Sequence, residues 1–266
     1  MKSTAKKSTV TRIPNRQARG MSTAEWDARC ELAAAYRLAN TLGWSDFLGT
    51  HFSLRVPGTQ DQFLLNPYGM LFEEMTASAL IKVDIEGNKL SESPYEVNRA
   101  GFVIHSAVHM GAPEAHCVMH CHTVAGVGVS SQKRGLLPIT QMALTAWSEI
   151  RYHDYEGVAD NEDERERIVK DLGDGTMLIL RNHGTLTVGS TVGEAFARMN
   201  RIERACRFQI AAQAGGAEAN PIPEEVVNYT AQQGRELAKT GRGAGGKLLW
   251  AALLRKLDRE DPGYRQ

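Results

Sequence analysis

Hydrophobic positions along this chain follow two different spacings. Short apolar or alternating runs predict strands, and longer stretches with apolar residues three or four apart predict amphipathic helices. Strands are predicted near 50–56, 62–66, 81–84, 117–122, 149–152 and 177–183, and helices near 23–43, 95–110, 123–131, 162–172, 196–212, 224–239 and 247–256. Because strands and helices interleave, the pattern indicates an α/β sandwich.

Histidines gather where two of the predicted strands end. One apolar run ends in the His-x-His of His120 and His122, and side chains two apart on a strand point to the same face. A second apolar run, 177–180, leads to His183, where Gly184 frees the backbone to turn. Three imidazoles that converge from these strand ends would form a metal site with open positions, as catalytic sites have.

Composition narrows the classes of protein. The 266 residues, 42% of them hydrophobic, suffice to bury a large core in one domain. The 31 basic and 31 acidic residues cancel, so no overall field favours nucleic acid or an anionic membrane as a partner. The four cysteines lack the paired spacing of a zinc ribbon or a disulfide framework, which fits a reducing cytoplasm. Cys121, between the two histidines, is expected to face away from them as a small buried apolar group.

Three segments of different character are expected. Residues 1–22 carry basic but no acidic side chains and no apolar stretch, which predicts a disordered basic arm rather than a secretory signal. A capping box from Ser22 to Glu25 opens the first helix of a folded domain predicted over 23–215. Residues 216–266 begin with a linker, and their two helices are expected to pack on the domain's own edge or across a neighbouring subunit.

Longer motifs accompany the histidines in a fixed order. They are the His-x-His pair with Gly135-Leu136-Leu137-Pro138-Ile139, Tyr152-His153-Asp154-Tyr155-x-Gly157, Leu180-Arg181-Asn182-His183-Gly184 and Val192-Gly193-Glu194-Ala195-Phe196. Together they resemble the class II aldolase and adducin head-domain family over about residues 24–215. The resemblance implies a three-layer αβα sandwich around a central mixed, mainly antiparallel sheet. It also implies a likeness to enzymes that form cyclic homotetramers with active sites at subunit interfaces.

The resemblance further implies a metal centre. His120, His122 and His183 match the family's metal ligands residue for residue. Three imidazoles without a carboxylate suit a divalent metal, with zinc first and iron(II) or manganese(II) as alternatives.

The chain departs from the sugar-phosphate aldolases that it resembles. Those enzymes move a proton with the glutamate of a Ser-Ser-Glu motif, whose position falls here on Gly101, with Arg99 and Ala100 in place of the serines. Their phosphate-binding Gly-Asn and Thr-Gly pairs correspond to Thr50-His51 and Tyr68-Gly69. A phosphorylated sugar is therefore not the expected substrate, while Arg99 remains able to bind a carboxylate through a bidentate pair.

Other groups must then handle protons and substrate. The proton-handling candidates are His51, Tyr68, His153 and Tyr155, and the substrate-binding candidates are Arg99 and Gly69. His153 and Tyr155 are favoured, because a neighbouring subunit can supply them at an interface site. His105 and His109 are four apart on one helix face, a spacing capable of ligation, but the resemblance makes His105 a packing residue.

Three functions fit these features. The favoured one is a metal-dependent lyase that cleaves a carbon–carbon bond of a small non-phosphorylated hydroxy- or oxo-acid, or decarboxylates it, with the metal as electron sink. The second is a non-haem iron oxygenase on the same scaffold. The third is an adducin-like module for binding or assembly, without catalysis.

Overall fold

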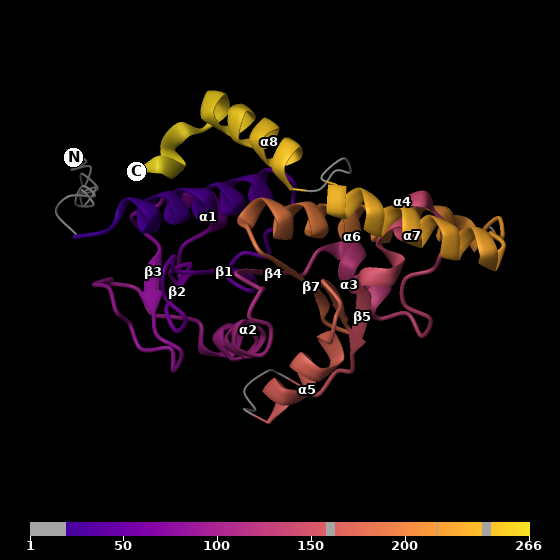
Figure 1. Ribbon diagram of the computed structural model, residues 1–266, viewed down its shortest axis with the longest axis horizontal. Helices are drawn as coiled ribbons and strands as arrows, with labels where there is room; N and C mark the ends of the chain where they lie inside the picture. The colour runs from indigo at the N-terminus through magenta and orange to yellow at the C-terminus, as the bar shows by residue number, and fades with distance from the viewer. Residues whose placement is uncertain (1–19, 158–162, 217, 241–245) are drawn as a thin grey trace, which may run out of the picture.

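A seven-stranded sheet organises the computed structural model, which describes residues 20–157, 163–216, 218–240 and 246–266 (Figure 1). The strands lie in the order β3-β2-β1-β4-β7-β6-β5. Their bounds are β1 His51–Arg55, β2 Phe63–Leu65, β3 Ile81–Val83, β4 Cys117–Cys121, β5 Ile150–His153, β6 Met177–Leu180 and β7 Gly184–Gly189. All neighbouring strands pair antiparallel except β5 and β6, which are parallel. The mixed, mainly antiparallel sheet is thus confirmed, and most of the predicted basic arm lies outside the described residues.

Helices cover both faces of this sheet. Their bounds are α1 Thr23–Thr41, α2 Arg99–Gly111, α3 Val124–Ser130, α4 Gln141–Ala146, α5 Glu164–Leu172, α6 Val192–Gln213, α7 Glu224–Thr240 and α8 Lys247–Glu260, with short 3-10 turns η2 Phe72–Glu74, η3 Trp147–Glu149, η4 Ala214–Gly216 and η5 Pro262–Arg265. Figure 1 shows α1 and α6 along one face and α2 and α5 along the other. The predicted three-layer sandwich is therefore confirmed. None of the described helices is both long and apolar enough to cross a membrane.

Alternate residues of β4 contribute to the two hydrophobic cores on opposite faces of the sheet. Met119 and Cys121 belong to the large core beneath α1 and α6, whereas Val118 belongs to a second core shared with α2 and α5. Because side chains alternate along a strand, His120 lies on the same face as Val118. Cys121 is fully buried on the other face, as its position between the histidines predicts, and burial raises the pKa of its thiol well above the ordinary value.

Two elements were not expected from the apolar pattern. Helix α4 lies in a stretch for which no helix or strand was predicted, and β7 follows His183 directly. Strand β7 reads as polar because threonines alternate with Leu186 and Val188, yet all six of its residues are buried. The hydroxyl of Thr187 donates to the Ala195 carbonyl oxygen at 3.0 Å, so this polar group is satisfied inside the core.

The first helix begins at Ser22, but its capping box is only half formed. The Ser22 hydroxyl accepts a hydrogen bond from the Glu25 amide at 3.1 Å. The Glu25 carboxylate instead binds the fully buried guanidinium of Arg29 at 2.9 Å and the Lys82 ammonium at 3.0 Å. Because Lys82 lies in β3, this ion-pair network ties the start of α1 to one edge of the sheet.

The C-terminal helices pack on the chain's own body. Helix α7 contacts α4, and α8 contacts α6 and α1. The Trp250 indole of α8 donates to the Glu31 carboxylate of α1. A Cβ on Gly193 would lie 2.6 Å from the Trp250 ring, so only glycine allows this close approach. The sequence left two arrangements open for these helices, packing on the domain's own edge or on a neighbouring subunit. The described contacts are with the domain itself.

Candidate metal centre

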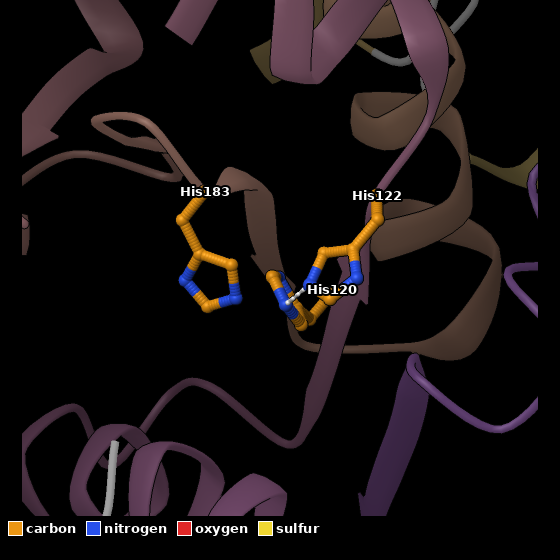
Figure 2. A group of neighbouring side chains, drawn as sticks. All are labelled: His120, His122 and His183. Atoms are coloured by element: carbon orange, nitrogen blue, oxygen red, sulfur yellow. Dashed lines mark hydrogen bonds between the residues drawn. The ribbon is translucent and has the colours of Figure 1, made fainter. Parts of the chain in front are cut away.

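Three histidines meet at the ends of neighbouring strands. His120 is in β4, His122 follows it, and His183 lies in the turn between β6 and β7. One nitrogen from each ring lies within 4.8 Å of the other two, and Figure 2 shows the rings facing one another. The Nε2 atoms of His120 and His122 are 2.8 Å apart. The structure thus brings together the three residues that the sequence placed in a metal site.

The turn that delivers His183 depends on Asn182 rather than on a flexible glycine. Asn182 has a φ of 58°, in the left-handed region that asparagine adopts more readily than most residues, and its amide donates to the Ser130 carbonyl at 3.1 Å. Gly184 has no such φ and already belongs to β7. A Cβ there would lie 2.5 Å from the Cys121 carbonyl oxygen. The expected role of Gly184 was therefore wrong, because the glycine provides space between strands and not a turn.

The outer nitrogens of two rings are held by fixed acceptors. His120 Nδ1 donates to the Thr185 carbonyl oxygen, and His122 Nδ1 donates to Asp46 Oδ2, each at 3.0 Å. A neutral imidazole that donates from Nδ1 has a bare Nε2. Both Nε2 atoms are therefore available as ligands, in the orientation that outer hydrogen bonds usually impose on metal-binding histidines.

Burial favours the neutral, ligating form of His120 and His183. It lowers the pKa of His120 well below the ordinary value, and the nearby rings of His183 and His51 lower it further. Burial and the neighbouring His122 lower the pKa of His183 to about 4. At pH 7 His120 and His183 therefore offer neutral nitrogens, and the group of mutually close ligand atoms among the described residues contains no carboxylate. This donor set fits zinc, iron(II) or manganese(II).

Asp46 is a functional candidate that the sequence did not reveal. It lies in the loop before β1, 76 residues from His122. Its neighbour Phe47 has a φ of 46°, and a Cβ on Gly49 would lie 2.8 Å from Asp46 Oδ2, so a small residue leaves room for the carboxylate. An exposed aspartate in a loop is common, and nothing in its local sequence distinguishes this one.

We expect Asp46→Ala to weaken metal binding about 10- to 100-fold, the usual loss when an outer hydrogen-bond partner of a ligand is removed. Without the carboxylate, the His122 ring rotates more freely and its Nε2 is a weaker base. Chelator competition on the folded protein measures this affinity, with the exposed Asp61→Ala as matched control. Equal metal affinity in Asp46→Ala and wild-type protein would contradict the role of this carboxylate.

The other predicted residues lie at different distances from the histidines. His51 pairs with His120 across β1 and β4, with ring centroids 5.4 Å apart. Tyr68 is half exposed, and Gly69 has a φ of +108° with the Tyr95 ring close by. Among the described contacts, neither Tyr68 nor Gly69 touches the three histidines. Arg99 begins α2, and its side chain is outside the described part of the structure.

His153 and Tyr155 differ sharply in environment. His153 is buried, with Nδ1 2.7 Å from Asp171 Oδ2 and Nε2 3.3 Å from Glu164 Oε1, so both ring nitrogens have carboxylate partners. Tyr155 is 55% exposed. Their predicted roles at a neighbouring subunit's site remain predictions, and the exposed Tyr155 is the better placed of the two to reach another chain.

The sheet, its helical layers and the histidine centre define the class of protein. Residues 30–210 match the family described as "Class II Aldolase and Adducin N-terminal domain", and the chain belongs to this family. A Pseudomonas aeruginosa protein, named provisionally as an aldolase class 2 protein, is 50% identical over 246 residues, which cover 92% of this chain and 95% of that protein. Alpha-adducin of Rattus norvegicus is 41% identical over 249 residues, which cover 89% of this chain but 33% of the adducin.

Solved structures agree with this assignment. An aldolase II superfamily protein from Pseudomonas syringae superposes with a TM-score of 0.85 at 44% identity, covering 93% of this chain and 98% of that one. An L-fuculose 1-phosphate aldolase from Glaciozyma antarctica superposes with a TM-score of 0.79 at 29% identity, covering 92% and 96%. The predicted family and fold are thus confirmed, and the family includes both aldolases and adducins.

Proposed function

We propose that this protein is a metal-dependent lyase that cleaves a carbon–carbon bond of a small, non-phosphorylated hydroxy- or oxo-acid, or decarboxylates it. The observation that carries the proposal is the convergence of three imidazoles, two of which have Nδ1 held by a fixed acceptor and Nε2 directed into the site. A divalent metal bound there would polarise a substrate carbonyl and stabilise the negative charge left when the bond breaks. The protein's own residues would hold the substrate and move protons.

The neutral state of the His51 ring supports a substrate without phosphate. His51 stands where the phosphate-binding aldolases that the chain resembles carry an asparagine. Burial lowers the pKa of His51 to about 3, so its ring is neutral at pH 7 and offers no charge to a dianion. The adjacent Thr50 is fully buried, and its hydroxyl has no hydrogen-bond partner among the described residues. A single carboxylate requires less charge, and Arg99 remains the proposed group for binding it.

The proposed proton-handling and substrate-binding residues lie at different depths around the histidine cluster. His51 lies beside the histidine cluster, whereas Tyr68, Gly69 and Tyr155 lie on exposed or partly exposed segments. A homotetramer in the cytoplasm, in which a neighbouring subunit brings Tyr155 and the region of His153 to the site, would close an otherwise open centre. Closing the site matters because excluding water strengthens the electrostatic interactions inside it.

Elemental analysis of protein purified without added metal or chelator tests the proposal first. We expect about one zinc or manganese per chain, and release of carbon dioxide or an aldehyde from members of a panel of free hydroxy- and oxo-acids. L-fuculose 1-phosphate serves as the matched phosphorylated compound, and we expect it not to turn over. Rapid turnover of that compound would contradict the argument from His51.

The same measurement distinguishes the other functions. Stoichiometric iron(II) with substrate-dependent oxygen uptake would replace the lyase by an oxygenase. The likeness to alpha-adducin favours a non-catalytic binding module as the second candidate. A metal-free site in an intact oligomer, with no turnover of any tested hydroxy- or oxo-acid after metal is added, would favour the binding module.

A further inference from the structure

Four buried polar side chains form a line between β1 and α2, beside the metal centre. His51 Nδ1 is 2.9 Å from His105 Nε2, and His105 Nδ1 is 2.6 Å from Ser53 Oγ. Ser53 Oγ is also 2.6 Å from His109 Nε2, and His109 Nδ1 is 2.7 Å from the Ala115 carbonyl oxygen. We call His51, His105, Ser53 and His109 the buried histidine network. Two of its members lie on one face of β1 and two lie one turn apart on α2.

The three rings of the buried histidine network are neutral at pH 7. All three rings are buried, and no acidic side chain is among their described hydrogen-bond partners. Burial also lowers the pKa of His109 to about 3 and that of His105 well below its ordinary value. A neutral imidazole carries one N–H, so each ring donates through one nitrogen and accepts through the other.

The Ala115 carbonyl oxygen, at one end of the buried histidine network, determines the direction of every hydrogen bond in it. The Ala115 carbonyl can only accept, so His109 Nδ1 carries the proton and His109 Nε2 is bare. Ser53 must then donate its single hydroxyl proton to His109 Nε2, and its oxygen accepts from His105 Nδ1. His105 Nε2 is consequently bare, and His51 Nδ1 donates to it. The last atom in the line, His51 Nε2, is left without a proton.

His51 Nε2 lies against the first turn of α2, next to the metal centre. A Cβ on Gly101 would fall 2.0 Å from this atom, so the His51 ring fills the space that any larger side chain at residue 101 would occupy. The His51 and His120 rings are 5.4 Å apart between centroids. Among the described residues, the cluster of mutually close ligand atoms contains His120, His122 and His183 but not His51. His51 is thus a neighbour of the centre and not one of its ligands.

The buried histidine network is suited to hold a tautomer and poorly suited to export a proton. A proton passed along it would place a positive charge on His109, which is 2% exposed. The Arg55 guanidinium, which donates to the His109 carbonyl oxygen, further disfavours that charge. The line also ends at a carbonyl that takes up no proton. Its effect is therefore to orient the His51 ring and fix which nitrogen is bare.

We propose that Ser53, His105 and His109 are positioning residues that hold His51 with Nδ1 protonated and Nε2 bare, so that His51 accepts the proton of a substrate hydroxyl. Consider a substrate acid whose hydroxyl group is β to its oxo group. The hydroxyl proton moves to His51 Nε2, and the electron pair of the O–H bond forms a new carbonyl. The neighbouring carbon–carbon bond then breaks, and its electron pair moves into the substrate's own oxo group. The chemical role rests on the proposed function, whereas the tautomer does not.

Nitrogen-15 NMR of the full chain, labelled at histidine and loaded with zinc, tests the tautomer directly. The chemical shift of each ring nitrogen reports whether it is protonated, and loss of one set of signals in His51→Gln assigns His51. We expect a bare Nε2 and a protonated Nδ1. In Ser53→Ala, His105 loses its acceptor and can carry its proton on Nε2, so we expect the His51 proton to shift partly or wholly to its own Nε2, with zinc content unchanged.

Ser106→Ala is the matched control, because Ser106 is a buried serine of α2 whose hydroxyl donates to the Val103 carbonyl, outside the network. It should keep the wild-type His51 tautomer. A protonated Nε2 in the wild-type protein would overturn the inference, as would a wild-type tautomer in folded Ser53→Ala. If Ser53→Ala does not fold, the wild-type spectrum alone decides. A bare Nε2 in a protein that turns over no hydroxy- or oxo-acid would refute the lyase and leave the positioning intact.

Discussion

The His122→Ala protein is expected to fold and to lose its metal. Two imidazoles remain after this change, and a two-nitrogen site binds zinc or manganese far less tightly than a three-nitrogen site with an open position. We expect the metal affinity to fall by more than about 100-fold, the upper end of the loss seen for outer partners of a ligand. Any lyase turnover should fall with it, because the metal would be the electron sink of the reaction.

Folding should survive this substitution because His122 lies at the rim of the site. Its side chain is 22% exposed, its Nδ1 donates to Asp46, and its Nε2 faces that of His120. Metal per chain after dialysis gives the main readout, and circular dichroism confirms the fold. His116→Ala removes an exposed imidazole elsewhere and should keep full metal occupancy. Full occupancy in folded His122→Ala would show that the site lies elsewhere.

Sequence reasoning succeeded where a local repeat sets the geometry. The two-residue period of a strand places His120 and His122 on one side, and this holds in any sheet that contains the strand. The apolar run before His183 placed the third ligand candidate at another strand end, but the family motif was needed to support its convergence with the pair, because no local rule connects residues about sixty positions apart. The chain's membership in that family made the motif a sound guide.

The missing parts of the site are long-range contacts. The spacing of His105 and His109 indicated that the two rings share a helix face, but not that Ser53, more than 50 residues away, lies between them. Asp46 and His122, which form another such contact, are 76 residues apart along the chain. A glycine at residue 101 was interpreted as the loss of a catalytic carboxylate. The structure adds that the His51 ring takes up the space beside it.

The hydrophobic pattern also failed to predict some local structure. Strand β7 is buried on both faces yet alternates threonine with aliphatic residues, so its polarity concealed its burial. In the same way, Glu25 was expected to complete a cap, but a fully buried Arg29 offers the carboxylate a stronger, charged partner. The Glu25 carboxylate also pairs with Lys82, 57 residues away in the sequence, so a contact outside the helix contributes to the local outcome.

The metal-free protein is expected to lose stability steeply as the pH falls below about 6.5. His51 and His109 are neutral in the fold, with pKa values lowered by burial to about 3, whereas an exposed histidine in the unfolded chain takes up a proton near pH 6.5. Between these values the unfolded state binds more protons, so the free energy of unfolding falls by about 1.4 kcal/mol per pH unit for each histidine. Two such residues remove about 7 kcal/mol between about pH 6.5 and 4, against a typical total of about 5–15 kcal/mol.

Urea unfolding at a series of pH values measures this slope, and His109→Gln isolates one contribution to it. The glutamine amide does not titrate, so we expect the slope to decrease by about 1.4 kcal/mol per pH unit even if the variant is less stable overall. His116→Gln, at an exposed position, is the matched control for removing one imidazole. An unchanged slope in His109→Gln would mean that the fold does not lower the pKa of His109, so that both of its ring nitrogens carry protons below about pH 6.5. The hydrogen-bond directions assigned to the buried histidine network require a bare Nε2 on His109, and they would then not hold in that pH range.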